Sequence, residues 1–229
     1  MKKNILITGA SGALGKATVE RFFEKGYHVI AIVSPGKKEA VLQSQDITVY
    51  EGDLTDEQRT ASLIKEIIAA HKTIDAAILT VGGYAGGSLE TTDGKQLHNM
   101  LAVNFETAYF VTRPIFAHML GQAFGRIILI GARPGLSAAA GKDAVAYSLS
   151  KALIFHLAEL LNAEAKSKNV VTSVIVPSTI DTPANRKAMP NADPAKWVST
   201  NDITDAMLFL VSDEGKALRE PVLKLYGNA

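Results

Sequence analysis

The chain has 229 residues, of which 47% are hydrophobic and 21% charged, and its formal net charge is +1. A chain of this length and balance can bury a substantial core, and its near-zero charge points to neither nucleic acid nor an anionic membrane as a partner. It contains no cysteine, which excludes a disulfide scaffold and a thiolate metal site. No stretch approaches the ~20 apolar residues of a membrane span. We therefore expect a cytoplasmic protein with a small-molecule substrate.

Seven short, nearly continuous apolar runs predict strands that are covered on both faces. These runs span residues 4–8, 27–33, 47–51, 75–80, 126–131, 170–176 and 221–226. Segments with apolar residues at helical spacing lie between them, at 13–26, 56–72, 97–120 and 145–168. This alternation predicts an α/β fold: one domain over residues 1–229, built on a single doubly wound Rossmann-type parallel sheet of about seven strands with helices on both faces.

Two irregular segments interrupt the alternation. Residues 82–94 are rich in glycine and follow the fourth strand, whereas residues 177–197 contain four prolines and follow the sixth. Ligands bind at the carboxyl ends of the strands in such sheets, so both segments should border the substrate. A functional lid is favoured here, with flexible connections as the alternative.

A glycine-rich turn, Thr8 to Gly15, separates the first strand from the first helix. Glycines allow a tight turn there and let the backbone approach a pyrophosphate, which then lies at the helix N-terminus. The turn therefore predicts a dinucleotide site. Its candidate contacts are Gly9, Ser11, Gly12, Ala13, Leu14 and Gly15.

The end of the second strand carries Ser34 where an NAD site usually has a carboxylate, and Lys37 and Lys38 follow it. Two lysines can pair with a 2′-phosphate, which favours NADPH over NADH, with a solvated helix start as the alternative explanation for the lysines. Asp53, after the third strand, is placed to accept a hydrogen bond from the adenine amine or to cap the next helix.

Tyr147 and Lys151 are four residues apart on a predicted helix, so their side chains share one face. A nearby ammonium should lower the pKa of the phenol and suit it to proton transfer, and the lysine can also reach the nicotinamide ribose. The helper hydroxyl expected just past the fifth strand is missing, because that place holds Gly131 and Ala132. The five histidines show no paired ligand spacing, so no metal site is expected.

Over essentially its whole length the chain resembles the short-chain dehydrogenase/reductase family. The match rests on TGASGALG at residues 8–15, on Asp53-Leu54 and on Tyr147 with Lys151. The resemblance implies an NAD(P)H-dependent oxidoreductase. In it, Leu54 joins Asp53 at the adenine and Asn104 belongs to the proton relay. The segment from Pro177 to Thr182 would hold the nicotinamide carboxamide, with Ile180 and Thr182 as the contacts.

Two departures from the family pattern stand out. Val81, Gly82 and Gly83 replace the Asn-Ala-Gly at the cofactor after the fourth strand, and Ala132 replaces the catalytic Ser. Together with VGGYAGG and the segment 177–197, they resemble the dihydropteridine reductase branch, which implies reduction of a quinonoid dihydropterin with Tyr147 as the proton donor. Such a substrate spreads the incoming charge over its ring, so one donor can suffice. Tyr84 would then stack on the pterin, or else only pack the loop.

The sequence leaves three hypotheses about function open. Besides the pterin reductase, the chain could be a short-chain reductase of a small carbonyl compound or quinone, with Asn104 and Ser137 in its relay. The third is a catalytically silent nucleotide sensor, which would not need Tyr147 and Lys151. The helices at 97–120 and 146–161 are apolar around much of their circumference. We therefore expect a homodimer or homotetramer.

Overall fold

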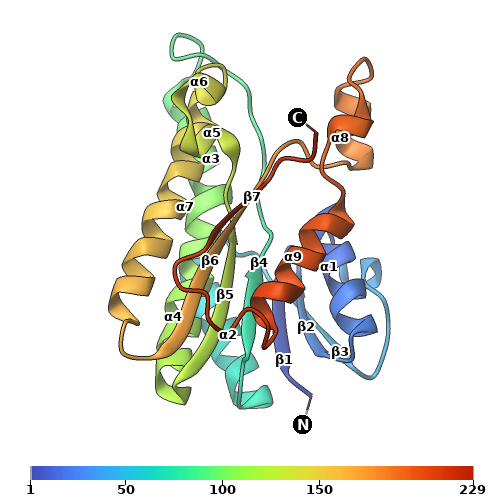
Figure 1. Cartoon of the computed structure of the whole chain (residues 1–229), viewed down its shortest axis with the longest axis vertical. Coiled ribbons are helices and arrows are strands. Elements are labelled where there is room, and N and C mark those ends of the chain that lie inside the picture. Colours follow the sequence, from blue (N-terminus) through green and yellow to red (C-terminus); the bar gives the residue numbers. More distant parts are fainter. Residues whose placement is uncertain (1, 229) are drawn as a thin grey trace.

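Seven parallel strands form one sheet with the order β3-β2-β1-β4-β5-β6-β7 (Figure 1). A computed structural model describes the chain from residue 2 to residue 228. The strands are β1 (Asn4–Thr8), β2 (His28–Val33), β3 (Ile47–Glu51), β4 (Ala76–Leu79), β5 (Phe124–Ile130), β6 (Asn169–Pro177) and β7 (Val222–Leu225). Because β1 pairs with both β2 and β4, the order reverses there and leaves a crevice at the carboxyl ends of these strands.

Residues 2–228 include six longer helices. They are α1 (Ala13–Glu24), α2 (Glu57–His71), α3 (Gly94–Leu101), α4 (Thr107–Gln122), α7 (Val145–Glu164) and α9 (Thr200–Val211). Five of them cover the sheet, and the sixth, α3, packs on α7. Short helical turns complete the fold: η1 (Lys38–Ala40), η2 (Ala102–Glu106), α5 (Arg133–Leu136), α6 (Ala138–Gly141), α8 (Pro183–Ala188) and η3 (Pro194–Lys196). The π-helical turn η2 joins α3 directly to α4.

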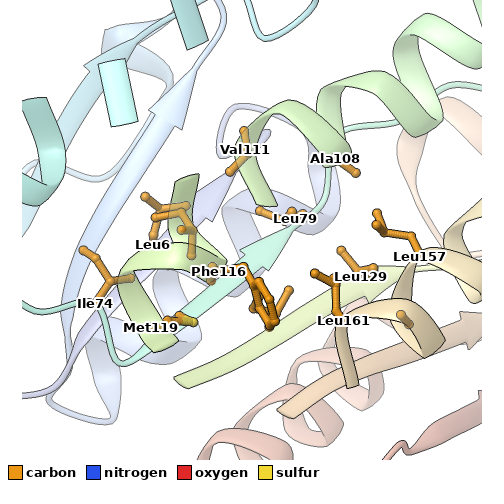
Figure 2. Packing of buried hydrophobic residues seen from close by; sticks show 14 of the residues in the cluster. Leu6, Ile74, Leu79, Ala108, Val111, Phe116, Met119, Leu129, Leu157 and Leu161 are labelled. Atoms are coloured by element: carbon orange, nitrogen blue, oxygen red, sulfur yellow. The ribbon is translucent and has the colours of Figure 1, made fainter. Parts of the chain in front are cut away.

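The core lies in two layers, one on each face of the sheet. Successive strand residues point to opposite faces, so Leu6 packs with α2, α4 and α7, whereas Ile5 and Ile7 pack with α1 and α9. Figure 2 shows part of the first layer, where Phe116 and Met119 of α4 lie against the sheet. Both faces of the central strands are therefore buried, which explains their continuous apolar runs, whereas the edge strand β7 alternates exposed and partly buried residues.

The predicted architecture is confirmed: the sheet has seven parallel strands, and each predicted strand lies within two residues of an observed one. The segment 177–197 differs from a plain loop because it contains α8 and η3. Pro183 and Pro194 each occupy the first turn of a short helix, where proline needs no amide partner, and Thr182 and Asp193 cap those helices. Two of the four prolines in this segment therefore mark helix starts.

The helix α9 is a further difference, since no helix was predicted at residues 200–211. Ser199 caps it by accepting a hydrogen bond from the amide of Asp202 at 3.0 Å. Between residues 2 and 228, no helix is long and apolar enough to cross a bilayer.

Candidate active site and nucleotide pocket

The turn between β1 and α1 is closed by glycines that no other residue could replace without strain. Gly9 has a φ of +65°, and a Cβ at this position would lie 2.9 Å from Thr80 Oγ1. At Gly15 a Cβ would collide with the carbonyl oxygen of Gly9. The first turn of α1 therefore lies directly on the backbone of the glycine turn.

The N-terminus of α1 is left open for an anion. Its N-cap, Gly12, offers no side-chain acceptor, and the first turn contains no acidic residue. Ser11 is half-buried, Gly12 and Ala13 are exposed, and Leu14 turns into the core. The unpaired amides and the positive end of the helix dipole fit a dinucleotide pyrophosphate.

A cavity of about 320 Å³ begins at this turn and extends across the ends of β2 and β3. Its lining residues are Gly9, Ile32, Val33, Ser34, Pro35, Gly52, Asp53, Leu54, Thr55, Val81, Val103 and Thr107. Gly9, Ser34, Asp53, Leu54 and Val81 were all predicted as cofactor contacts, and the fold brings them around one cavity. Lys37 and Lys38 are exposed and do not line it.

The carboxylate of Asp53 faces this cavity without capping a helix. Its Oδ1 accepts hydrogen bonds from the amide of Thr55 at 3.0 Å and from the Thr55 hydroxyl at 2.7 Å. These bonds hold the pKa of Asp53 below its usual range. The cap of α2 is Asp56, which accepts from the amide of Arg59 at 3.0 Å. The alternative that Asp53 caps the helix is therefore wrong.

Tyr147 and Lys151 share one face of α7, one turn apart, as their spacing predicts. Lys151 is only 4% exposed, and its Nζ donates to the carbonyl oxygen of Ile130 at 2.8 Å. Burial lowers the pKa of Lys151 to about 8. The lysine is thus anchored at the carboxyl end of β5, beside the sheet.

The phenol of Tyr147 does not have the lowered pKa that the sequence suggested. Burial, and secondarily the neighbouring Tyr84, raise the pKa of Tyr147 to about 12. Desolvation disfavours the phenolate, and the Lys151 ammonium is directed at Ile130. Tyr147 is therefore protonated at neutral pH and suited to donating a proton.

Tyr84 packs against Tyr147 from the glycine-rich loop. The ring centroids are 5.1 Å apart and the planes meet at 70°, an edge-to-face contact. The Tyr84 side chain is 69% exposed. The loop is tied to the start of α7, because Gly87 accepts a hydrogen bond from the amide of Val145 at 2.9 Å and donates to Asp143 O at 2.8 Å. These two hydrogen bonds fix the segment 82–94 next to Tyr147.

Asn104, in η2, joins the glycine-rich loop to α7. Its Oδ1 accepts from the amide of Gly83 at 2.9 Å, and its Nδ2 donates to Gly83 O at 3.1 Å and to Ser150 Oγ at 3.2 Å. At Gly82 a Cβ would lie 2.9 Å from Asn104 Oδ1 and 3.4 Å from Lys151 Nζ. The side chain of Asn104 is therefore occupied in positioning the loop, at 1% exposure.

Ala132 places a buried methyl group where the sequence comparison expects a hydroxyl. It is 4% exposed and precedes α5. The helix α5 packs closely on α7, since a Cβ added at Gly135 would lie only 2.8 Å from the Lys151 backbone.

The nearby serine hydroxyls do not take the place of the missing one. Ser137 lies beyond α5 as the N-cap of α6. Ser148 and Ser150 donate to Pro134 O at 2.7 Å and Tyr147 O at 2.8 Å. Neither of these two hydroxyls is free to replace the missing one.

The segment after β6 contains Pro177, Ile180 and Thr182, which the resemblance assigns to the nicotinamide. Pro177 is the last residue of β6 and pairs with Leu225 of β7. Ile180 pairs with Val198, and its carbonyl accepts from Asn185 Nδ2 at 2.8 Å. The hydroxyl of Thr182 accepts from the amide of Asn185 at 3.1 Å as the cap of α8.

Val103 and Thr107 line the nucleotide cavity but were not predicted. They lie on either side of Asn104 in the continuous helix formed by η2 and α4. Their spacing of four residues, one helical turn, places them on the same face and is the sequence signal that could have identified them. No group of three or more metal-ligating side chains occurs within the described part of the chain.

Comparison with known proteins matches residues 3–193 to a family model described as short chain dehydrogenase. An acetoacetyl-CoA reductase from Acinetobacter is 27% identical, with 99% of this chain and 97% of the relative covered. A dihydropteridine reductase from Dictyostelium discoideum is 29% identical, with 90% and 87% covered. Dihydropteridine reductase is thus one of several distant relatives and is not set apart from the others.

Solved structures show the same fold. ElxO with NADP bound superposes with a TM-score of 0.92 at 24% identity, and 99% of this chain and 98% of that one are covered. An oxidoreductase of the short chain dehydrogenase/reductase family from Burkholderia thailandensis gives a TM-score of 0.86 at 26% identity, with 99% and 92% covered. The likeness extends over nearly the whole chain in both cases.

Proposed function

The chain belongs to the short-chain dehydrogenase family and is an NAD(P)-dependent oxidoreductase, and from this premise we propose that it reduces a quinonoid dihydropterin to the tetrahydropterin. The observation that carries the proposal is the buried methyl group of Ala132 in place of the serine, in a chain that keeps Tyr147 and Lys151 on α7. An enzyme that must stabilise a localised oxyanion gains from a second donor at this place. A substrate that spreads the charge over a ring does not.

The nucleotide cavity fits the dinucleotide that this reaction requires. The turn from Gly9 to Gly15 would bind the pyrophosphate at the N-terminus of α1, and Asp53 and Leu54 would hold the adenine. Gly82 and Gly83, with Ile180 and Thr182, would border the nicotinamide half. When bound in reduced form, the dinucleotide supplies the hydride.

Tyr147 donates the proton in this proposal. Its pKa of about 12 keeps the phenol protonated at neutral pH. Lys151 can contact the nicotinamide ribose once its hydrogen bond to Ile130 O is exchanged. The exposed ring of Tyr84, 5.1 Å from that of Tyr147, offers a flat face for a bicyclic substrate.

NADPH is the proposed cofactor in preference to NADH. Ser34 leaves no carboxylate at the end of β2, and Lys37 and Lys38 follow on the same exposed turn. ElxO, the structural relative of matching fold, has NADP bound. The lysines do not line the cavity itself, so they would act by reaching a phosphate from its rim.

A second copy of this chain is the proposed partner, in a homodimer or homotetramer. Leu149, Leu153 and Leu160 are 51%, 39% and 56% exposed on one side of α7, and Tyr109 of α4 is 39% exposed. These two helices lie side by side on the same face of the sheet (Figure 1). An isologous contact would bury this apolar surface.

Reduction of a small carbonyl compound is the second candidate. The similarity to an acetoacetyl-CoA reductase and the buried Asn104 favour it. A panel of quinonoid dihydropterin, ketones, quinones and a 3-oxoacyl thioester, followed by nicotinamide absorbance, separates the two. Turnover of the pterin with poor ketone turnover supports the proposal, and efficient ketone reduction without pterin reduction contradicts it.

A further inference from the structure

The turn after β2 is held in place by a carboxylate from the neighbouring strand. Glu51 is the last residue of β3, and its Oε1 accepts a hydrogen bond from the amide of Gly36 at 2.9 Å. Gly36 has a φ of +73°, and the amide of Lys37 donates to Ser34 O at 3.1 Å. The residues from Ser34 to Lys37 thus form a tight turn with a glycine at its left-handed position. The hydrogen bond from the amide of Gly36 to Glu51 ties this turn to the end of β3.

The same carboxylate lies along an extension of the nucleotide cavity. A second cavity, of about 220 Å³, shares Pro35, Gly52 and Asp53 with the first and adds Glu51 and Arg59 to the lining. Arg59 forms its ion pair with Asp56 and not with Glu51, since its Nε lies 3.3 Å from a carboxylate oxygen of Asp56. A negative charge therefore faces the end of the pocket where β2 and β3 terminate.

That end of the pocket is where the adenosine ribose is recognised in sheets of this kind. A 2′-phosphate there would use the donors of the turn, namely the amide of Gly36 and the ammonium groups of Lys37 and Lys38. Glu51 already occupies the amide of Gly36 and places a like charge beside the phosphate. The usual carboxylate on β2 is replaced by Ser34, so Glu51 supplies the carboxylate from β3 instead.

We propose that Glu51 is a cofactor-specificity residue that opposes Lys37 and Lys38. Its carboxylate disfavours a 2′-phosphate and accepts hydrogen bonds from the free ribose hydroxyls of an unphosphorylated dinucleotide. The protein therefore binds both NADPH and NADH, and Glu51 limits the preference that the lysines create. The proposal rests on the nucleotide pocket alone, so it holds or fails independently of the substrate.

Calorimetric titration with 2′,5′-ADP and 5′-ADP tests the adenosine half directly, without any catalytic readout. Glu51→Gln keeps an acceptor for the amide of Gly36 and removes only the charge. We expect 2′,5′-ADP to bind about five- to tenfold more tightly to this variant. The substitution removes the repulsion between the carboxylate and the 2′-phosphate, which is modest in a water-exposed pocket. The affinity for 5′-ADP should stay equal or fall by about twofold, because the ribose loses a charged acceptor.

Glu57→Gln is the matched control. It removes one negative charge at the start of α2, where Glu57 Oε1 pairs with Arg113 Nη1 at 2.8 Å. Glu57 lines neither cavity. The ratio of the two affinities should not change in this variant. An unchanged ratio in Glu51→Gln, or an equal shift in Glu57→Gln, overturns the proposal. Titration with NADPH and NADH should follow the same ratio.

Discussion

At the scale of single residues, Tyr147 has the clearest assigned role. Tyr147→Phe should reduce kcat with quinonoid dihydropterin by roughly 10²–10⁴-fold, the range for loss of a general acid. NADPH affinity should barely change, because the hydroxyl acts on the substrate. Steady-state kinetics and a cofactor titration measure both effects.

Two hydroxyl variants serve as controls for that result. Ala132→Ser should not improve pterin reduction, since no localised oxyanion needs a second donor, although it should create weak ketone reduction. Ser137→Ala should be nearly silent, because Ser137 lies beyond α5 as the cap of α6. If Ser137→Ala were as damaging as Tyr147→Phe, a displaced serine would complete an ordinary carbonyl-reducing site.

Lys151 links activity to stability through its buried charge. Its pKa is about 8 in the folded chain and 10.5 in the reference state, so the unfolded chain binds more protons between these values. The free energy of unfolding should therefore rise with pH across this window, by roughly 2–3 kcal/mol for this group. In Lys151→Met that rise should be absent. Urea unfolding at about pH 7 and about pH 9.5 compares the two, and parallel pH dependences would contradict the assignment.

Lys37 and Lys38 set the sign of the proposed cofactor preference. NADPH should bind more tightly than NADH, because two ammonium groups outweigh the single carboxylate of Glu51. Charge reversal at both lysines should weaken NADPH binding by about 1–3 kcal/mol, the range for hydrogen bonds to charged groups. Fluorescence titrations check this. Equal or better binding of NADH by the unaltered protein would refute the NADPH preference.

At the scale of elements, the contact between the glycine turn and α1 is the most demanding. Gly15→Ala would push a Cβ into the carbonyl of Gly9, so α1 must move away from the turn. We expect a loss of roughly 1–3 kcal/mol in stability, as for other overpacked sites, together with weaker dinucleotide binding.

Gly121→Ala is the matched control, because nothing lies within 4 Å of a Cβ at that helical position. It should stabilise the protein by about 0.4–1 kcal/mol and leave dinucleotide binding unchanged. Thermal unfolding of both variants, with and without NADPH, distinguishes a packing effect from a general glycine effect. Equal destabilisation by the two changes would disprove the close contact.

The elements were predictable wherever periodicity and flanking residues agreed. The strands were found because burial on both faces produces apolar runs, and α1, α2 and α7 because their apolar residues recur at helical spacing. The helix α8 was missed because the segment 177–197, with its four prolines, was predicted to be irregular. The π-helical turn η2 was not predictable, because it depends on how Asn104 meets Gly83 and Ser150 across the fold.

At the scale of the whole molecule, the exposed apolar side of α7 predicts self-association. Leu149→Lys with Leu153→Lys should yield a monomer, because two charges would be buried without partners in an isologous contact. Light scattering at micromolar concentration should give at least the dimer mass for the unaltered chain. A monomer mass for the unaltered chain would rule out the proposed partner.

The strand positions, the glycine turn and the shared helical face of Tyr147 and Lys151 could be predicted from the sequence, since each depends on residues close together in the chain. The protonation and contacts of those groups depend instead on the folded structure. Burial raised the pKa of Tyr147 although a lysine lies one turn away, and the register of β3 beside β2 brought Glu51 to the turn at Gly36. Desolvation and strand register depend on contacts between residues far apart in sequence, and periodicity carries no record of them.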